Sequence, residues 1–145
     1  MLTREDCQAV DAIEDASTSV LTLAEGLTPA ELRTSRLTKF ELRRQLLRMC
    51  DAHAALSAAA RERMEELDFD GWANTRRRLC EGGESESSAS WIAIGAMAPT
   101  TLGWIRFYRS RNPELFLTRA ESGEPLATAA DPSQQAGDQK ASGAG

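Results

Sequence analysis

Histidine, tyrosine and cysteine are scarce in this sequence, and their scarcity limits the chemistry that it can support. His53 is the only histidine, Tyr108 is the only tyrosine, and the three cysteines include no CxxC pair. Zinc sites usually combine several closely spaced cysteine and histidine ligands. Cys50 and His53 have a CxxH spacing, but no second ligand pair follows, so we expect neither a metal site nor a cofactor.

Long apolar runs are also missing. The longest apolar stretch, residues 91–105, is interrupted by Gly95, Pro99 and Gly103 and is too short to span a bilayer. The first residues, MLTREDCQ, are polar and acidic, unlike a secretory signal. An odd number of widely spaced cysteines is typical of reduced thiols in the cytosol. The sequence therefore predicts a cytoplasmic protein with no membrane partner.

The charge is modest overall but unevenly distributed. The net charge is −5, yet residues 33–78 carry eleven Lys and Arg against seven acids, whereas residues 1–32 carry one against seven. An acidic chain is not a general nucleic-acid binder, although its central segment can still meet phosphate locally. At 145 residues, of which 41% are hydrophobic, the chain has the size and composition of one folded domain.

Apolar residues recur at steps of three and four, which predicts amphipathic helices. We expect a first helix ending near Gly26, followed by a capping box formed by Thr28 and Glu31. A second capping box, Thr38 with Glu41, precedes one long predicted helix. Its apolar stripe comprises Leu42, Leu46, Met49, His53, Leu56, Ala60, Met64 and Leu67.

Two further helices follow in the prediction. Asp70 is the expected N-cap of a helix through Leu79 that stops at Gly82-Gly83, and residues 84–88 are expected to form an exposed loop. Residues 90–111 are expected to form a helix bent near Pro99. Without any strand pattern, the sequence predicts an all-α antiparallel bundle of four to five helices.

The last part of the chain has a different composition. From about residue 122 onward it consists mainly of Ala, Gly, Ser, Gln, Asp and Pro, with hardly any large apolar side chain. Such a segment buries too little surface to offset the entropy of ordering. We therefore predict a helical domain over residues 1–117 and a disordered tail over residues 118–145.

The order of features between Asp11 and Ile105 resembles the HepT-like toxins of the HEPN superfamily. The matching stretches are Ala24 to Thr28 at the end of the first helix, Leu46 to Ser57 in the long helix, the turn Glu66 to Phe69, and Trp91 to Ile105. Counting without a gap places Arg76 on the arginine of the family's Arg-x4-His-x-Tyr motif. The resemblance implies a HEPN-like bundle.

The same motif departs from the family pattern at its other positions. Arg77 stands where the family has asparagine, Glu81 stands at the histidine position, and Gly83 stands at the tyrosine position. In active relatives the motif cleaves RNA without a metal, at a site shared across a homodimer. An imidazole titrates near neutral pH and can accept the proton of a ribose hydroxyl, while a guanidinium holds the phosphate.

Glutamate has an ordinary pKa of about 4.3, so it is a weaker base, and its charge repels phosphate. The resemblance thus implies a toxin–antitoxin component, related to metal-independent endoribonucleases, whose RNA cleavage is impaired. In some relatives the motif tyrosine is adenylylated by a nucleotidyltransferase antitoxin of the MntA type. Gly83 has no hydroxyl, so that control cannot operate at this position.

Each candidate residue also has an ordinary structural interpretation. Arg76 either binds phosphate or forms a structural ion pair, and Asp51 either supports Arg76 or is a solvated charge. Arg77 either supports the site or lies on the surface. The basic residues around Arg43, Arg44 and Arg48 form either a solvated face or a surface for RNA or a protein partner.

The apolar residues and the single histidine fit the interior of a bundle. His53 lies on the apolar stripe of the long helix, which favours a core position over a catalytic one. We expect Trp91, Ile94, Met97, Leu102 and Ile105 to lie in the core. Trp91, Gly95, Ala98 and Leu102 share a face that offers a possible dimer contact.

Three hypotheses of function remain open. As an enzyme, the protein would hold the scissile phosphate with Arg76 and use Glu81 as the base. As a non-catalytic helical dimer, it would bind a nucleotidyltransferase-type antitoxin or RNA without turnover. A helical adaptor unrelated to toxins is the third hypothesis.

Overall fold

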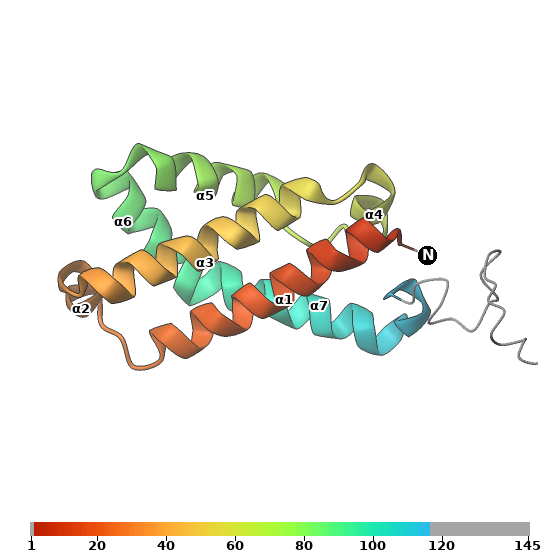
Figure 1. The fold of residues 1–145 in the computed structure, drawn as a ribbon, viewed down its shortest axis with the longest axis horizontal. Coiled ribbons are helices and arrows are strands. Elements are labelled where there is room, and N and C mark those ends of the chain that lie inside the picture. Colours follow the sequence, from red (N-terminus) through yellow and green to blue (C-terminus); the bar gives the residue numbers. More distant parts are fainter. Residues whose placement is uncertain (1, 117–145) are drawn as a thin grey trace, which may run out of the picture.

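The computed structural model describes residues 2–116, and in this part of the chain all regular structure is helical. The elements in chain order are α1 (Arg4–Ala24), α2 (Pro29–Thr34), α3 (Arg36–Ala55), α4 (Ala58–Arg63), α5 (Phe69–Glu81), α6 (Gly83–Ile92), the π-helical η1 (Ala93–Met97), α7 (Ala98–Arg111) and the 3-10 helix η2 (Pro113–Phe116). Figure 1 shows α1, α3, α5 and α7 running in alternating directions. The prediction of an all-α antiparallel bundle is confirmed, whereas the predicted tail lies outside the described residues.

The core lies between α1, α3, α5 and α7. Helix α1 contributes Val10, Ile13 and Val20, and it packs against both α3 and α7. The predicted stripe of the long helix is buried along its whole length. Trp72 of α5 and Ile105 of α7 complete the interior, and the indole Nε1 of Trp72 donates a hydrogen bond of 3.1 Å to the Thr101 hydroxyl.

One of the two predicted capping boxes is present. The Thr28 hydroxyl accepts a hydrogen bond from the Glu31 backbone amide, and the Glu31 carboxylate accepts one from the Thr28 backbone amide. Two backbone N–H groups that lack a partner within the helix are bonded in this way. The prediction of a second capping box at Thr38 and Glu41 was wrong, because α3 already begins at Arg36, directly after Ser35. Thr38 lies inside α3, and its hydroxyl accepts from Ser35 instead.

The long helix predicted from Leu42 to Leu67 is two helices. Helix α3 ends at Ala55, and Ser57 caps α4 by accepting from the Ala60 amide. Asp6 of α1 accepts hydrogen bonds from the Ser57 amide and hydroxyl, at 2.9 and 2.7 Å. This contact stabilises the break, and it joins residues that are 51 positions apart in the sequence.

The start of α5 and the segment after it also differ from the prediction. Asp68, not Asp70, caps α5 by accepting from the Gly71 amide at 2.9 Å. Gly82 and Gly83 both have positive φ and stop α5 as expected. The expected loop over residues 84–88 was wrong, because helix α6 begins at Gly83 and is held against its neighbours by side-chain contacts.

The expected bend near Pro99 takes the form of a π-helical segment, η1, directly before α7. Pro99 lies in the first turn of α7, where its missing N–H removes no hydrogen bond. The predicted apolar face was wrong in part, since Ala98 and Leu102 are buried within the bundle and are not available for a dimer contact. Trp91, expected in the core, is 38% exposed.

None of the helices in the described part of the chain combines the length and the apolar character needed to cross a membrane.

Candidate functional site

The junction of α3 and α5 brings together two of the residues singled out in the sequence. Nε of Arg76 on α5 donates to the Asp51 carboxylate on α3 at 2.7 Å, and both side chains are about half exposed. This hydrogen bond to Asp51 raises the pKa of Arg76, so the guanidinium remains charged at any ordinary pH. The hypothesis that Asp51 and Arg76 form an ion pair is therefore confirmed.

Glu81, at the end of α5, is engaged by two other groups. Arg77 donates to its carboxylate at 2.6 Å, one helical turn back, and the Ser85 hydroxyl donates at 2.8 Å. The hydrogen bond from Ser85 and the charge of Arg77 lower the pKa of Glu81. A carboxylate with a lowered pKa holds a proton less well, which makes it a poorer general base.

Arg76 and Glu81 do not converge within one copy of the chain. A spacing of five residues turns about 140° around a helix axis, so their side chains leave α5 in different directions. Arg76 faces Asp51, whereas Glu81 faces Arg77 and Ser85. Within one copy, the two side chains therefore engage different partners.

The basic residues of α3 are largely engaged in ion pairs. Arg43 contacts Glu86 at 3.1 Å, Arg44 contacts Glu41 at 2.6 Å, and Arg48 contacts Asp15 at 3.2 Å. Arg43 joins α3 to α6, and Arg48 joins α3 to α1. Their charges are therefore partly neutralised before any partner is met.

His53 lies in the core of the bundle and does not belong to the candidate functional site. Its ring stacks on Trp72 at a centroid distance of 5.3 Å, and Nδ1 donates to the Met49 carbonyl at 2.7 Å. Nε2 is buried and has no hydrogen-bond partner among the described residues. Burial lowers the pKa of His53 to about 4, so the ring is neutral at pH 7.

The cysteines do not suggest a metal centre. Burial raises the pKa of the Cys50 thiol to about 12, whereas Cys80 is exposed and its Sγ accepts from Arg76 at 3.6 Å. No cluster of three or more Cys, His, Asp or Glu side chains suited to a metal ion occurs within residues 2–116.

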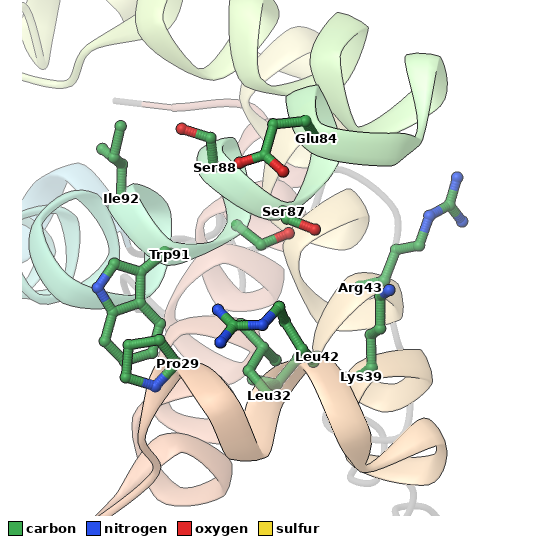
Figure 2. Close-up of a pocket in the computed structure, with 12 residues that line it drawn as sticks. Pro29, Leu32, Lys39, Leu42, Arg43, Glu84, Ser87, Ser88, Trp91 and Ile92 are labelled. Atoms are coloured by element: carbon green, nitrogen blue, oxygen red, sulfur yellow. The ribbon is translucent and has the colours of Figure 1, made fainter.

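A cavity that the sequence did not reveal lies between α2, α3 and α6 (Figure 2). Its volume is about 390 Å³, and Leu32, Leu42 and Trp91 are among the residues that line it. Trp91 was expected in the core because it follows the apolar pattern of its segment. The exposed cations near the start of the long helix were the only sequence signal for this region.

Comparisons with protein-family models, with curated proteins and with solved structures found no match.

Proposed function

We propose that this protein is a HepT-like component of a toxin–antitoxin pair, related to metal-independent ribonucleases, in which RNA cleavage is impaired. The observation that carries the proposal is the state of the motif residues on α5. Arg76 is charged and half exposed beside Asp51, whereas Glu81 is an ionised carboxylate held by Arg77 and Ser85. This arrangement suits phosphate binding by Arg76 better than proton transfer by Glu81.

Glu81, at the position of the motif histidine, is poorly suited to act as a general base. A general base works best when its pKa lies near the operating pH. The pKa of Glu81 is lowered from a value that is already far below neutral pH. In addition, its negative charge opposes the approach of an RNA phosphate to the same end of α5.

A homodimer is part of the proposal, because Arg76 and Glu81 point in different directions within one chain. Leu37 and Phe40 lie on α3 with 84% and 65% of their surfaces exposed, and they offer an apolar contact for a second copy. A dimer held by this pair would dissociate in Leu37→Ser/Phe40→Ser, measured by light scattering. The matched control is Phe107→Ser, which removes an exposed aromatic ring elsewhere.

The partner in the proposal is a nucleotidyltransferase-type antitoxin in the cytoplasm, which neutralises the toxin by binding. Gly83 has φ of +61°, a conformation that disfavours any side chain. The motif position of the modifiable tyrosine is therefore built for glycine in this chain. Arg43, Arg44 and Arg48 provide the candidate surface for the antitoxin or for RNA.

The second candidate function is a non-catalytic dimer that binds an antitoxin or RNA without turnover. The contacts of Glu81 with Ser85 and Arg77 favour it, because they lower the pKa of the carboxylate and make it a poor general base. The two candidates differ in their response to Glu81→Gln. An enzyme loses both cleavage and growth arrest in this variant, whereas a binding protein keeps its affinity for its partner.

The experiment follows growth arrest and RNA cleavage for the wild type, Arg76→Ala and Glu81→Gln, with cleavage assayed in EDTA. If the wild type cleaves RNA weakly and both substitutions abolish this cleavage, the protein is an impaired enzyme. Growth arrest that survives Glu81→Gln without any cleavage supports the binding protein. Cleavage that requires an added metal ion would contradict the relationship to metal-independent ribonucleases.

A further inference from the structure

We propose that the cavity between α2, α3 and α6 binds a small aromatic monocarboxylate. The cavity has a volume of about 390 Å³, which lies at the lower end of the range of small-molecule sites. It lies away from the Asp51–Arg76 pair, and the inference does not rest on the proposed toxin function. Three features of its lining point to this class of ligand.

The first feature is an apolar floor beside an exposed aromatic ring. Leu32 of α2 and Leu42 of α3 are buried and form the floor. Trp91 and Ile92 of α6 also line the cavity, although 38% and 50% of their surfaces remain exposed. Figure 2 shows Trp91 beside Pro29 on one side of the cavity, with Lys39 and Arg43 on the other. An indole placed at such an opening can stack on a planar ring.

The second feature is the balance of charge at the opening. Arg33 and Lys39 line the cavity, and neither forms an ion pair with any residue of the described range. Arg43, by contrast, is already paired with Glu86. Glu84 is the single acid in the lining. Two unpaired cations against one carboxylate leave an excess of one positive charge, which matches a monoanion.

The third feature is a serine hydroxyl in the lining that has no hydrogen-bond partner. Ser90 lines the cavity, and its hydroxyl oxygen, which is not fully buried, forms no hydrogen bond within residues 2–116. A serine hydroxyl can donate one hydrogen bond to a ligand. The partly buried Ser87 and Ser88 line the same wall of α6. A carboxylate oxygen inside the cavity would accept a hydrogen bond from such a hydroxyl.

These features assign each part of the ligand to a part of the cavity. The ring lies between the Trp91 indole and the leucine floor, and the carboxylate faces Arg33 and Lys39 within reach of the serine wall. An aliphatic acid of similar size would lose the stacking on Trp91. A neutral aromatic alcohol would lose the ion pairing.

The test is isothermal titration calorimetry of the full-length protein with 2-naphthoate as the probe. We expect a dissociation constant below about 1 mM. Binding of octanoate and of 2-naphthalenemethanol should each be weaker by about tenfold or more. Absence of heat with 2-naphthoate would overturn the proposal, and octanoate binding at least as tightly would overturn the assignment of an aromatic ligand.

Matched variants locate the binding site. Arg33→Ala/Lys39→Ala should weaken 2-naphthoate binding by about tenfold or more. Arg63→Ala/Arg106→Ala removes the same charge from two exposed cations outside the cavity and should leave binding unchanged. Trp91→Ala should likewise weaken binding, whereas Phe107→Ala should not. Equal loss in both double variants would show general charge attraction and overturn the site.

Discussion

Asp51 and His53 lie two residues apart on α3, and each contacts a residue of α5. The contact of Asp51 is an exposed ion pair, whereas the contact of His53 is a buried aromatic stack. Asp51 pairs with Arg76 in a contact that water reaches from the outside. His53 stacks on Trp72 in the core, where neither ring is exposed to water. The same pair of helices is thus joined by a buried contact and an exposed one.

The difference separates what holds the fold from what is available for function. Removing water from aromatic and apolar surface contributes stability in proportion to the area buried. An exposed ion pair contributes little, because water and salt screen it. Loss of the contact between Asp51 and Arg76 should therefore cost the fold little, whereas loss of the contact between His53 and Trp72 should cost it much more.

Breaking the buried contact should have the largest effect. Trp72→Ala removes a fully buried indole and leaves the Thr101 hydroxyl without its donor, so we expect a loss of about 3–5 kcal/mol in the free energy of unfolding. Urea denaturation measures this loss. Trp91→Ala, at an exposed position, is the matched control and should change stability far less. Similar losses in the two variants would contradict the distinction between buried and exposed contacts.

Acidification should weaken the same buried contact. The pKa of His53 is about 4 in the folded protein and about 6.5 in an unfolded chain, so the unfolded state binds more protons between these values. Stability is therefore fully present above pH 6.5 and falls by about 3 kcal/mol as the pH drops toward 4. Urea denaturation at a series of pH values tests the slope.

The control for this pH dependence is His53→Leu, which keeps an apolar side chain in place and removes the titrating ring. The fall in stability between pH 6.5 and 4 should largely disappear in this variant. A slope that persists unchanged would show that other groups cause it.

Breaking the exposed contact should affect binding and not folding. Arg76→Ala should leave the urea midpoint unchanged within experimental error. If Arg76 contacts a phosphate, the slope of log affinity against log salt for single-stranded RNA should become shallower by about 0.7. Fluorescence anisotropy with a labelled RNA measures both slopes, and Arg63→Ala is the control for loss of one exposed charge. An unchanged slope in Arg76→Ala would remove Arg76 from the RNA surface.

The smallest effect is expected at Glu81. Glu81→Gln removes one exposed charge, so we expect an unchanged urea midpoint and a gain in RNA affinity of less than about twofold at low salt. The gain should vanish as added salt screens the charge. A large loss of stability would instead show that the pairing of Glu81 with Arg77 is essential to the end of α5.

Local patterns in the sequence predicted the fold well where local physics decides it. The apolar stripe from Leu42 to His53 defined the buried face of α3, and Thr28 with Glu31 defined the start of α2. The break at Ser57 was missed because its stabilising partner, Asp6, is distant in the sequence, while the neighbouring alanines favour a continuous helix.

Helix α6 was missed for a related reason. Its sequence is rich in serine and glutamate, which resembles a loop, but contacts of Glu86 with Arg43 and of Ser85 with Arg78 hold it against α3 and α5. Tertiary contacts of this kind override local propensity. The cavity beside Trp91 depends on the position of α6, so it could not be predicted either.

The sequence identified the charged residues of the candidate site, but it did not identify which residues most of them contact. The pairing of Asp51 with Arg76 depends on α3 and α5 packing together. The contacts of Glu81 with Arg77 and Ser85 were not predicted, because Ser85 was placed in a loop. The fold decides which charged side chains form ion pairs and which remain available to bind a partner.

The most direct test of impaired cleavage is to restore the motif. In the variant Arg77→Asn/Glu81→His, an imidazole replaces the carboxylate, and we expect RNA cleavage in EDTA that exceeds the activity of the wild type and disappears when Arg76→Ala is added. Wild-type cleavage as fast as that of the restored variant would contradict the claim of impairment. A folded restored variant that does not cleave RNA would contradict the relationship to metal-independent ribonucleases.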